Sequence, residues 1–211
     1  AGTEPTLTRE DAEAVLRECP AVLDVAPIQS GTGQIVYGNQ NWSTIIMGTT
    51  TSILHIRDWQ IAAGRMFTDQ DERHANKVCV IGATVAEKLF GALDPIGQPV
   101  RIKKIPFTVI GVLDRKGQTM TGQDQDDIVY VPISTAQKRL FRVVFPGMVQ
   151  FLMVKAVSTE ALDRAEEQMT ALLRQRHRIG NGQENDFTVR NLTQMMQTAV
   201  NIARIMTVLL G

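Results

Sequence analysis

This sequence of 211 residues has few cysteines, no long apolar run and no excess of charge of either sign. Its 22 basic and 22 acidic residues cancel, so the overall charge does not attract the chain to nucleic acid. Two cysteines, Cys19 and Cys79, are too few to indicate a disulfide-rich fold. The sequence contains no run of 18 apolar residues, so it predicts no complete membrane span. With 44% hydrophobic and 21% charged residues, the composition is that of a folded globular chain and excludes collagen and disorder.

The residue patterns of common enzymes are absent as well. The sequence has no GxxxxGK[ST] phosphate loop, no GxSxG nucleophile elbow, no HExxH zinc motif and no dinucleotide-binding glycine spacing. A zinc site would need His55 and His74 to converge with both cysteines, and His177 is expected to be solvated at a helix end. We therefore predict that this domain is not an enzyme. We assign it no catalytic, cofactor-binding or metal-ligating residue and no cofactor.

Three clustered carboxylates, Asp124, Asp126 and Asp127, form the sharpest polar feature. Clustered carboxylates suit a hard cation such as Ca²⁺, but the glycine and the terminal glutamate of an EF-hand loop are absent. The alternative is a solvated loop that caps a strand starting at Ile128. The missing EF-hand pattern favours this second interpretation.

The N-terminal third reads as one short helix followed by three strands. Thr8 and Asp11 form a capping box, and apolar residues recur after it at helical spacing up to Cys19. The strands are expected at 22–28, 34–37 and 42–47, with turns at 31–33 and 38–41 between them.

The pattern of predicted elements changes near Gly64, after which shorter strands and helices alternate. A capping box of Thr84 and Glu87 predicts a helix that ends at Gly91, and Ser134 with Gln137 predicts another helix start. Strands are expected at 78–81, 100–102, 107–113 and 128–131.

The last third predicts a strand, a helix and a second strand. The strand at 149–157 is nearly all apolar, which is typical of a strand covered on both faces. A helix over Glu160–Arg178 and a strand over Phe187–Arg190 follow, so this part is an α+β or βαβ unit. A continuous helix is expected over Leu192–Leu210. Its rising hydrophobicity indicates either a cut inside a longer apolar segment or a short terminal core helix, and no signal peptide opens the sequence.

Several motifs occur in an order that resembles a known family. They are Gly64-Arg65 with Phe67 and Asp71, Val78 to Gly82, Leu89-Phe90-Gly91, Pro95-Ile96-Gly97-Gln98, Phe107 to Val112, and Gly122 to Asp127 leading to Val131-Pro132 and Ser134 to Gln137. This series resembles the extracytoplasmic core domain of ABC-transporter permeases of the macrolide-exporter (MacB) type. The resemblance covers roughly residues 20–192.

The resemblance implies an α+β fold in two parts. A discontinuous porter-like α+β subdomain would comprise residues 1–66 and 145–192, and a smaller strand-rich subdomain would be inserted at 67–144. Residues 193–211 would form a helix leading toward a transmembrane segment. The domain would lie on the extracytoplasmic (periplasmic) face of the bacterial inner membrane, as part of an integral membrane protein.

The resemblance also implies partners and a role. The partners would be the permease's own transmembrane and ABC ATPase domains, a second copy in the full-length homodimer, a periplasmic adaptor protein and an outer-membrane channel, and no nucleic acid. The leading hypothesis is a non-catalytic module that couples ATP-driven motion of the membrane helices to export of a drug, peptide or lipoprotein. The alternative is a signalling or scaffold domain of an FtsX-like permease that activates a cell-wall hydrolase. A small hydrolase with an unrecognised site is the third hypothesis.

Overall fold

The computed structural model describes residues 6–192 and residue 195. The helix expected over Leu192–Leu210 lies outside the described residues except for Leu192 and Met195. The described chain is a mixture of helices and strands. In chain order the elements are α1 (Arg9–Glu18), β1 (Val22–Tyr37), β2 (Gln40–Thr49), α2 (Ser52–Ile56), β3 (Ile61–Gly64), α3 (Asp69–Arg73), β4 (Val78–Ile81), α4 (Ala83–Phe90), β5 (Pro99–Ile102), β6 (Ile105–Leu113), β7 (Ile128–Pro132), α5 (Ile133–Thr135), the π-helical turn η1 (Ala136–Leu140), β8 (Phe151–Ala156), the 3-10 turn η2 (Thr159–Ala161) and α6 (Leu162–Arg176).

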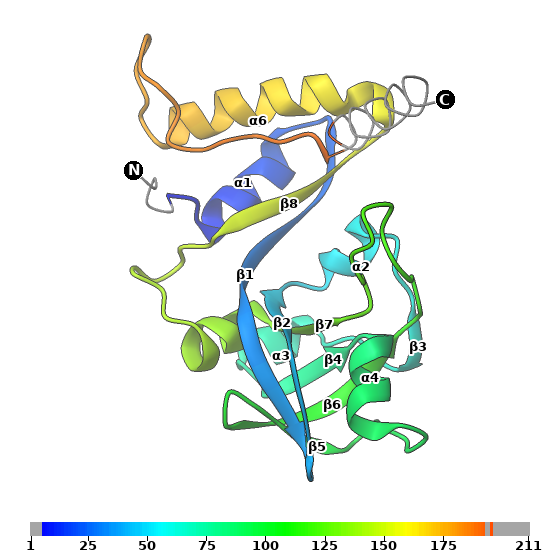
Figure 1. The fold of residues 1–211 in the computed structure, drawn as a ribbon. Coiled ribbons are helices and arrows are strands. Elements are labelled where there is room, and N and C mark those ends of the chain that lie inside the picture. Colours follow the sequence, from blue (N-terminus) through cyan, green and yellow to red (C-terminus); the bar gives the residue numbers. More distant parts are fainter. Residues whose placement is uncertain (1–5, 193–194, 196–211) are drawn as a thin grey trace, which may run out of the picture.

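A single strand of 16 residues, β1, runs through the whole molecule (Figure 1). Its first part pairs antiparallel with β8, and its second part pairs with β2 and β5. The turn expected at 31–33 is therefore wrong. Gly31 lies in the strand opposite Ile46, and a Cβ added to it would lie only 2.6 Å from a ring carbon of Phe141. Glycine at this position permits close packing of a helix end on the strand, rather than a change of direction.

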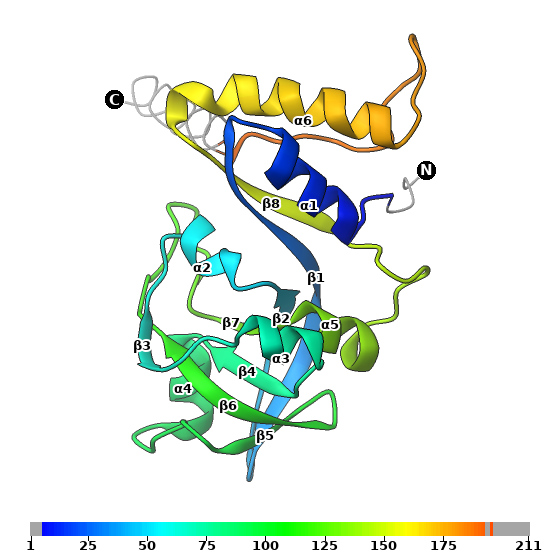
Figure 2. The same ribbon diagram turned by 180° about the vertical axis from the view of Figure 1, so that it is seen from behind.

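The strands form one hydrogen-bonded order, β2-β7-β4-β6-β5-β1-β8, with β3 added beside β6. The β2–β7 and β4–β6 pairs are parallel, and the remaining pairs are antiparallel. Two lobes result, as Figures 1 and 2 show. The upper lobe comprises residues 6–28 and 149–192, where α1 and α6 cover one face of the β1–β8 pair. The lower lobe comprises residues 29–148.

Three clusters of buried apolar side chains hold these lobes together. One fills the upper lobe between α1, α6 and the β1–β8 pair, and another lies under α4 in the lower lobe. The remaining cluster is shared, because Ala26 and Met153 of the upper lobe pack there with Tyr130 of the lower lobe. Alternate side chains of β8 thus pack on opposite faces, as the apolar sequence of this segment predicts.

The packing of the lower lobe differs from the expected unit over 67–144. Ile35 of β1 and Ile46 of β2 pack in the same cluster as Ile81 and Val129. The reason is that β2 pairs with β7 and β1 pairs with β5, so the β1–β2 hairpin supplies two strands of this sheet. The lower lobe accordingly begins near residue 29 instead of residue 67.

Most of the shorter expected elements are present. The capping box of Thr8 and Asp11 starts α1, and the strands of the middle region appear as β4, β5, β6 and β7. The expected box at Thr84 is absent, because α4 begins after Gly82 and the Thr84 hydroxyl donates to Asp124 at 2.6 Å. No side-chain cap precedes α5 either.

Two further expectations concern the end of the described chain. The strand expected over Phe187–Arg190 does not form, so the strand–helix–strand unit lacks its second strand. Across residues 6–192 and 195, no helix is both long enough and apolar enough to cross a bilayer.

Candidate functional site

Four charged side chains meet where the start of α1 approaches the end of α6, and we call them the clasp: Asp11, Arg176, His177 and Asp186. One oxygen of Asp11 accepts from Nε of Arg176 at 2.6 Å, and the other lies 3.0 Å from Nε2 of His177. The opposite ring nitrogen, Nδ1, lies 2.8 Å from Asp186. The Asp11 side chain is only 3% exposed and that of His177 10%. The clasp therefore ties α1, α6 and the following segment together.

The clasp geometry favours a protonated imidazole. Both ring nitrogens of His177 face carboxylates, and a neutral ring carries only one N–H to donate. Burial opposes the charge, but the hydrogen bonds to Asp11 and Asp186 outweigh it and raise the pKa of His177 above 6.5. Burial likewise opposes the charge of Asp11, yet its bonds from Arg176 and His177 hold its pKa below 3.8. The expectation that His177 is solvated is wrong.

The clasp predicts a specific dependence of stability on pH. Because the pKa of His177 is raised on folding, its stabilising contribution is complete below about pH 6.5 and is lost as the pH rises through the folded pKa. The lowered pKa of Asp11 adds stability above pH 3.8 that is lost as the pH falls through the folded pKa. We expect the free energy of unfolding, measured in urea, to fall between pH 6 and pH 9.

The variant His177→Gln isolates this contribution, because glutamine does not titrate. It should cost about 1–2 kcal/mol at pH 6 and flatten the alkaline slope. His74→Gln serves as the control, since His74 lies at the end of α3 and no carboxylate of the described chain is within hydrogen-bond distance of its ring. An unchanged slope in His177→Gln would contradict the charged clasp.

Ion pairs connect the two lobes on both sides of β1. Arg9 of α1 lies 2.7 Å from Glu72 of α3, whose carboxylate also accepts from the main-chain N–H of Ser134. On the other side, Lys155 of β8 lies 2.7 Å from Asp58 and donates to the carbonyl of His55. These contacts brace the joint between the lobes.

The three clustered carboxylates are used within the fold. Asp126 is 1% exposed and accepts from the main-chain N–H groups of Lys116 and Gly117 at 2.8 and 2.9 Å. Asp127 accepts from the indole N–H of Trp42, and Asp124 accepts from the Thr84 hydroxyl. The interpretation as a solvated loop is therefore wrong for Asp126, which holds the preceding loop instead.

Other groups considered for metal or redox chemistry are separated. Within the described residues, no group of three or more His, Cys, Asp or Glu side chains could hold a metal ion. Cys19 and Cys79 are both buried and unpaired, and burial raises the pKa of each thiol. They act as small apolar side chains in the cores of the two lobes.

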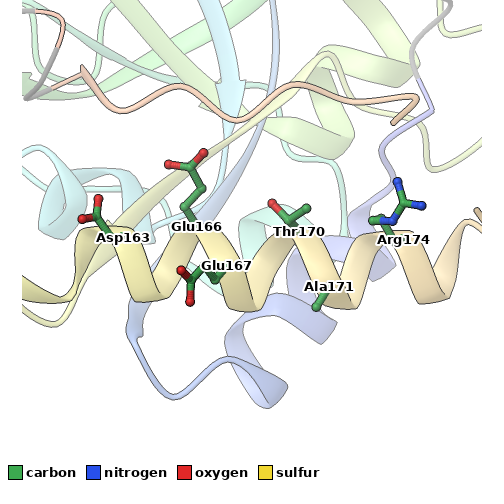
Figure 3. A pocket seen from close by; sticks show the side chains of 6 residues that line it. All are labelled: Asp163, Glu166, Glu167, Thr170, Ala171 and Arg174. Atoms are coloured by element: carbon green, nitrogen blue, oxygen red, sulfur yellow. The ribbon is translucent and has the colours of Figure 1, made fainter. Parts of the chain in front are cut away.

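Two hollows lie along α6. An apolar groove of about 520 Å³ lies between β8 and α6 on one side and residues 187–192, which follow Asp186, on the other. It is lined by Leu7, Val15, Phe151, Leu152, Met153, Val154, Ala156, Leu162, Ala165, Glu166, Met169, Leu173, Phe187, Thr188, Val189, Arg190, Asn191 and Leu192. The described residues that line the second hollow, about 570 Å³, all belong to α6, and Figure 3 shows Asp163, Glu166 and Arg174 along one side of that helix.

The motifs that carry the resemblance have structural roles. Gly64 has a φ of +72°, and a Cβ there would lie 2.2 Å from the carbonyl oxygen of Ile110. Asp71 accepts from Thr68, Arg65 and Asn76, and these bonds outweigh its burial and lower its pKa to about 2. These residues fix the loop that leads into β4.

Comparisons with known proteins agree with the sequence motifs. The family of the MacB-like periplasmic core domain matches residues 1–172. The macrolide export ATP-binding/permease protein MacB of Syntrophobacter fumaroxidans is 35% identical over 260 aligned positions, which cover 99% of this chain and 36% of that protein. The pyoverdine export ATP-binding/permease protein PvdT of Pseudomonas aeruginosa is 32% identical, over 97% of this chain and 30% of that protein. The chain thus spans about a third of the length of these relatives.

Solved structures show the same likeness. The periplasmic region of MacB from Actinobacillus actinomycetemcomitans superposes with a TM-score of 0.75 at 25% identity, over 93% of this chain and 84% of that one. The extracellular domain of the transporter YknZ from Gram-positive bacteria shares the fold, with a TM-score of 0.70 at 22% identity over 88% of this chain and 89% of that one. The chain therefore belongs to the family of MacB-like periplasmic core domains, as the motifs predicted.

Proposed function

We propose that this domain is a non-catalytic, periplasmic part of an ABC-transporter permease that transmits motion of the membrane helices during export. Its family and its relatives, which are ATP-binding/permease export proteins, support this role. The observation that carries the proposal is the continuity of β1, which passes from the upper to the lower lobe without a break. A hydrogen-bonded strand transmits displacement along its axis better than a flexible linker does.

The bracing of the joint supports the same role. The shared apolar cluster and the ion pairs Arg9–Glu72 and Lys155–Asp58 join the lobes on either side of β1. Displacement of the upper lobe would then move the lower lobe as well, instead of being absorbed between them.

We further propose that the upper lobe is the porter-like subdomain and the lower lobe the inserted, strand-rich one. The upper lobe is built from both ends of the described chain, and Thr6 donates to the carbonyl of Asp186 there. The partners of the whole domain would be the transmembrane and ATPase domains of a homodimeric permease, a periplasmic adaptor and an outer-membrane channel. The export proteins among the relatives favour this role over that of an FtsX-like activator.

The experiment weakens the joint in the full-length transporter. The double variant Arg9→Ala/Lys155→Ala removes one ion pair on each side of β1. Each pair includes a side chain that is accessible to solvent, and ion pairs of this kind contribute little to stability, so the domain should still fold. We expect export to fall several-fold while ATP hydrolysis persists, because the ATPase would then be uncoupled from the periplasmic part.

Arg17→Ala is the matched control, because among the described residues Arg17 pairs only with its neighbour Glu18 on the exposed side of α1. It should leave both export and ATPase activity unchanged. Undiminished export in the double variant, with the lobes shown by hydrogen exchange to be loosened, would contradict transmission through the joint.

A further inference from the structure

Among the strands that the structure describes, β8 lies at the end of the order and has one open edge. Pro27 of β1 lies opposite Leu152, and proline has no N–H, so this pair cannot exchange two hydrogen bonds. Such pairs alternate along an antiparallel ladder. The main-chain groups of Phe151 and Met153 therefore point to β1, and those of Leu152 and Val154 point to the open edge.

The open edge has no partner within the described part of the chain. No hydrogen bond joins the main chain of Leu152 or Val154 to the segment Phe187–Arg190, which the sequence predicts as a strand. The apolar groove lies between β8 and this segment. An edge strand with free N–H and C=O groups beside an apolar groove is the arrangement that accepts an added strand.

The negative charge at one end of the groove indicates which side chains a bound segment would carry. Glu166 lines both the groove and the neighbouring hollow on α6, is half-buried, and forms no ion pair with any described residue. The hollow also includes the carboxylates of Asp163 and Glu167, of which Asp163 lies on the same side of α6 as Glu166 (Figure 3). A basic side chain would complement this end of the groove, and apolar side chains would complement the rest.

We propose that the open edge of β8 binds an extended peptide segment of a partner protein. Its main chain pairs with Leu152 and Val154, alternate apolar side chains enter the groove, and a basic side chain faces Glu166. This site is separate from the proposed transmission of motion, and either can fail without the other.

Two other occupants fit the observations less well. The chain's own segment over 187–190 makes no main-chain hydrogen bond to Leu152 or Val154, and its preceding residue Asp186 is already held by His177 and by Thr6. A second copy pairing edge to edge would bring the acidic side of α6 toward its own copy, where like charges repel.

The test uses the 211-residue chain and a synthetic peptide, acetyl-Lys-Val-Thr-Val-Thr-Val-amide. We expect saturable binding by calorimetry and slower hydrogen exchange of the Val154 amide when the peptide is present. A peptide methylated on alternate main-chain nitrogens should bind about tenfold more weakly, because it cannot donate to the edge.

Matched variants locate the site. Val154→Pro removes an outward N–H and spares the bonds to β1, so it should weaken binding about tenfold, whereas Val154→Thr keeps the N–H and should not. Glu166→Gln should weaken the lysine peptide and leave its alanine analogue unchanged. Urea unfolding of each variant checks that the fold persists.

Several results would overturn the proposal. One is no binding at about 1 mM peptide, and another is equal binding by Val154→Pro and the unaltered chain. A Val154 amide that is already protected without peptide would show that Phe187–Arg190 closes the edge. A dimer in sedimentation that Val154→Pro abolishes would show that a second copy occupies it.

Discussion

Replacing Asp11 with alanine is expected to lower the free energy of unfolding by about 4 kcal/mol. The carboxylate accepts from the main-chain N–H of Thr8, from Arg176 and from His177, and it is almost fully buried. Its loss removes the bond that Asp11 contributes to the capping box of α1, at about 1 kcal/mol, and leaves a buried imidazolium without one partner, at about 3 kcal/mol. Urea unfolding at pH 6 measures the difference.

Two further variants separate the cap from the charge. Asp11→Asn retains an acceptor for Thr8 but not the negative charge, so it should cost less than Asp11→Ala. Adding His177→Leu to Asp11→Ala should restore part of the stability, because no unpaired imidazolium then remains buried. A loss below about 1 kcal/mol in Asp11→Ala would contradict the role given to the clasp.

The sequence predicted the elements whose signals are local. Thr8 and Asp11 lie three positions apart, so their capping box can be recognised without knowing what surrounds the helix. The strands β4 and β7 are short apolar runs with turn residues on either side, and such runs form strands when both faces are covered.

The clasp could not be predicted from local signals. Asp11 and His177 are 166 positions apart, and His177 follows a helix end rich in arginine, which is typical of solvated residues. Only the packing of α1 against α6 brings the two side chains together. The groove could not be predicted from local signals either. The alternation of apolar and polar residues in Phe187–Arg190 predicts a strand but does not reveal whether a partner strand is within reach.

The turn predicted at 31–33 did not form for a related reason. Gly31 resembles a turn residue in sequence, but its place is fixed by Phe141, which is 110 positions away. The Thr84 box failed similarly, since the Thr84 hydroxyl donates to Asp124 and α4 starts without a side-chain cap. In each case a contact distant in sequence replaces the local role that the residue type suggests.

Replacing Asp126 with alanine should lower the free energy of unfolding by about 3 kcal/mol. The carboxylate is buried and accepts from the N–H groups of Lys116 and Gly117, so its removal leaves two main-chain donors without a partner. The loop over 114–127 should then lose its anchor. Urea unfolding measures the loss, and hydrogen exchange of the Lys116 and Gly117 amides shows where it arises.

Asp127→Ala provides the control, since it removes one bond, to Trp42, from a half-buried side chain, and it should cost about 1 kcal/mol. The same measurements with added Ca²⁺ test the other interpretation of the acidic cluster. A cation bound to the folded chain would stabilise it in proportion to the logarithm of its concentration, and Asp126→Ala would remove that effect. We expect no stabilisation by Ca²⁺, because the oxygens of Asp126 already accept from main-chain N–H groups that a cation would have to displace.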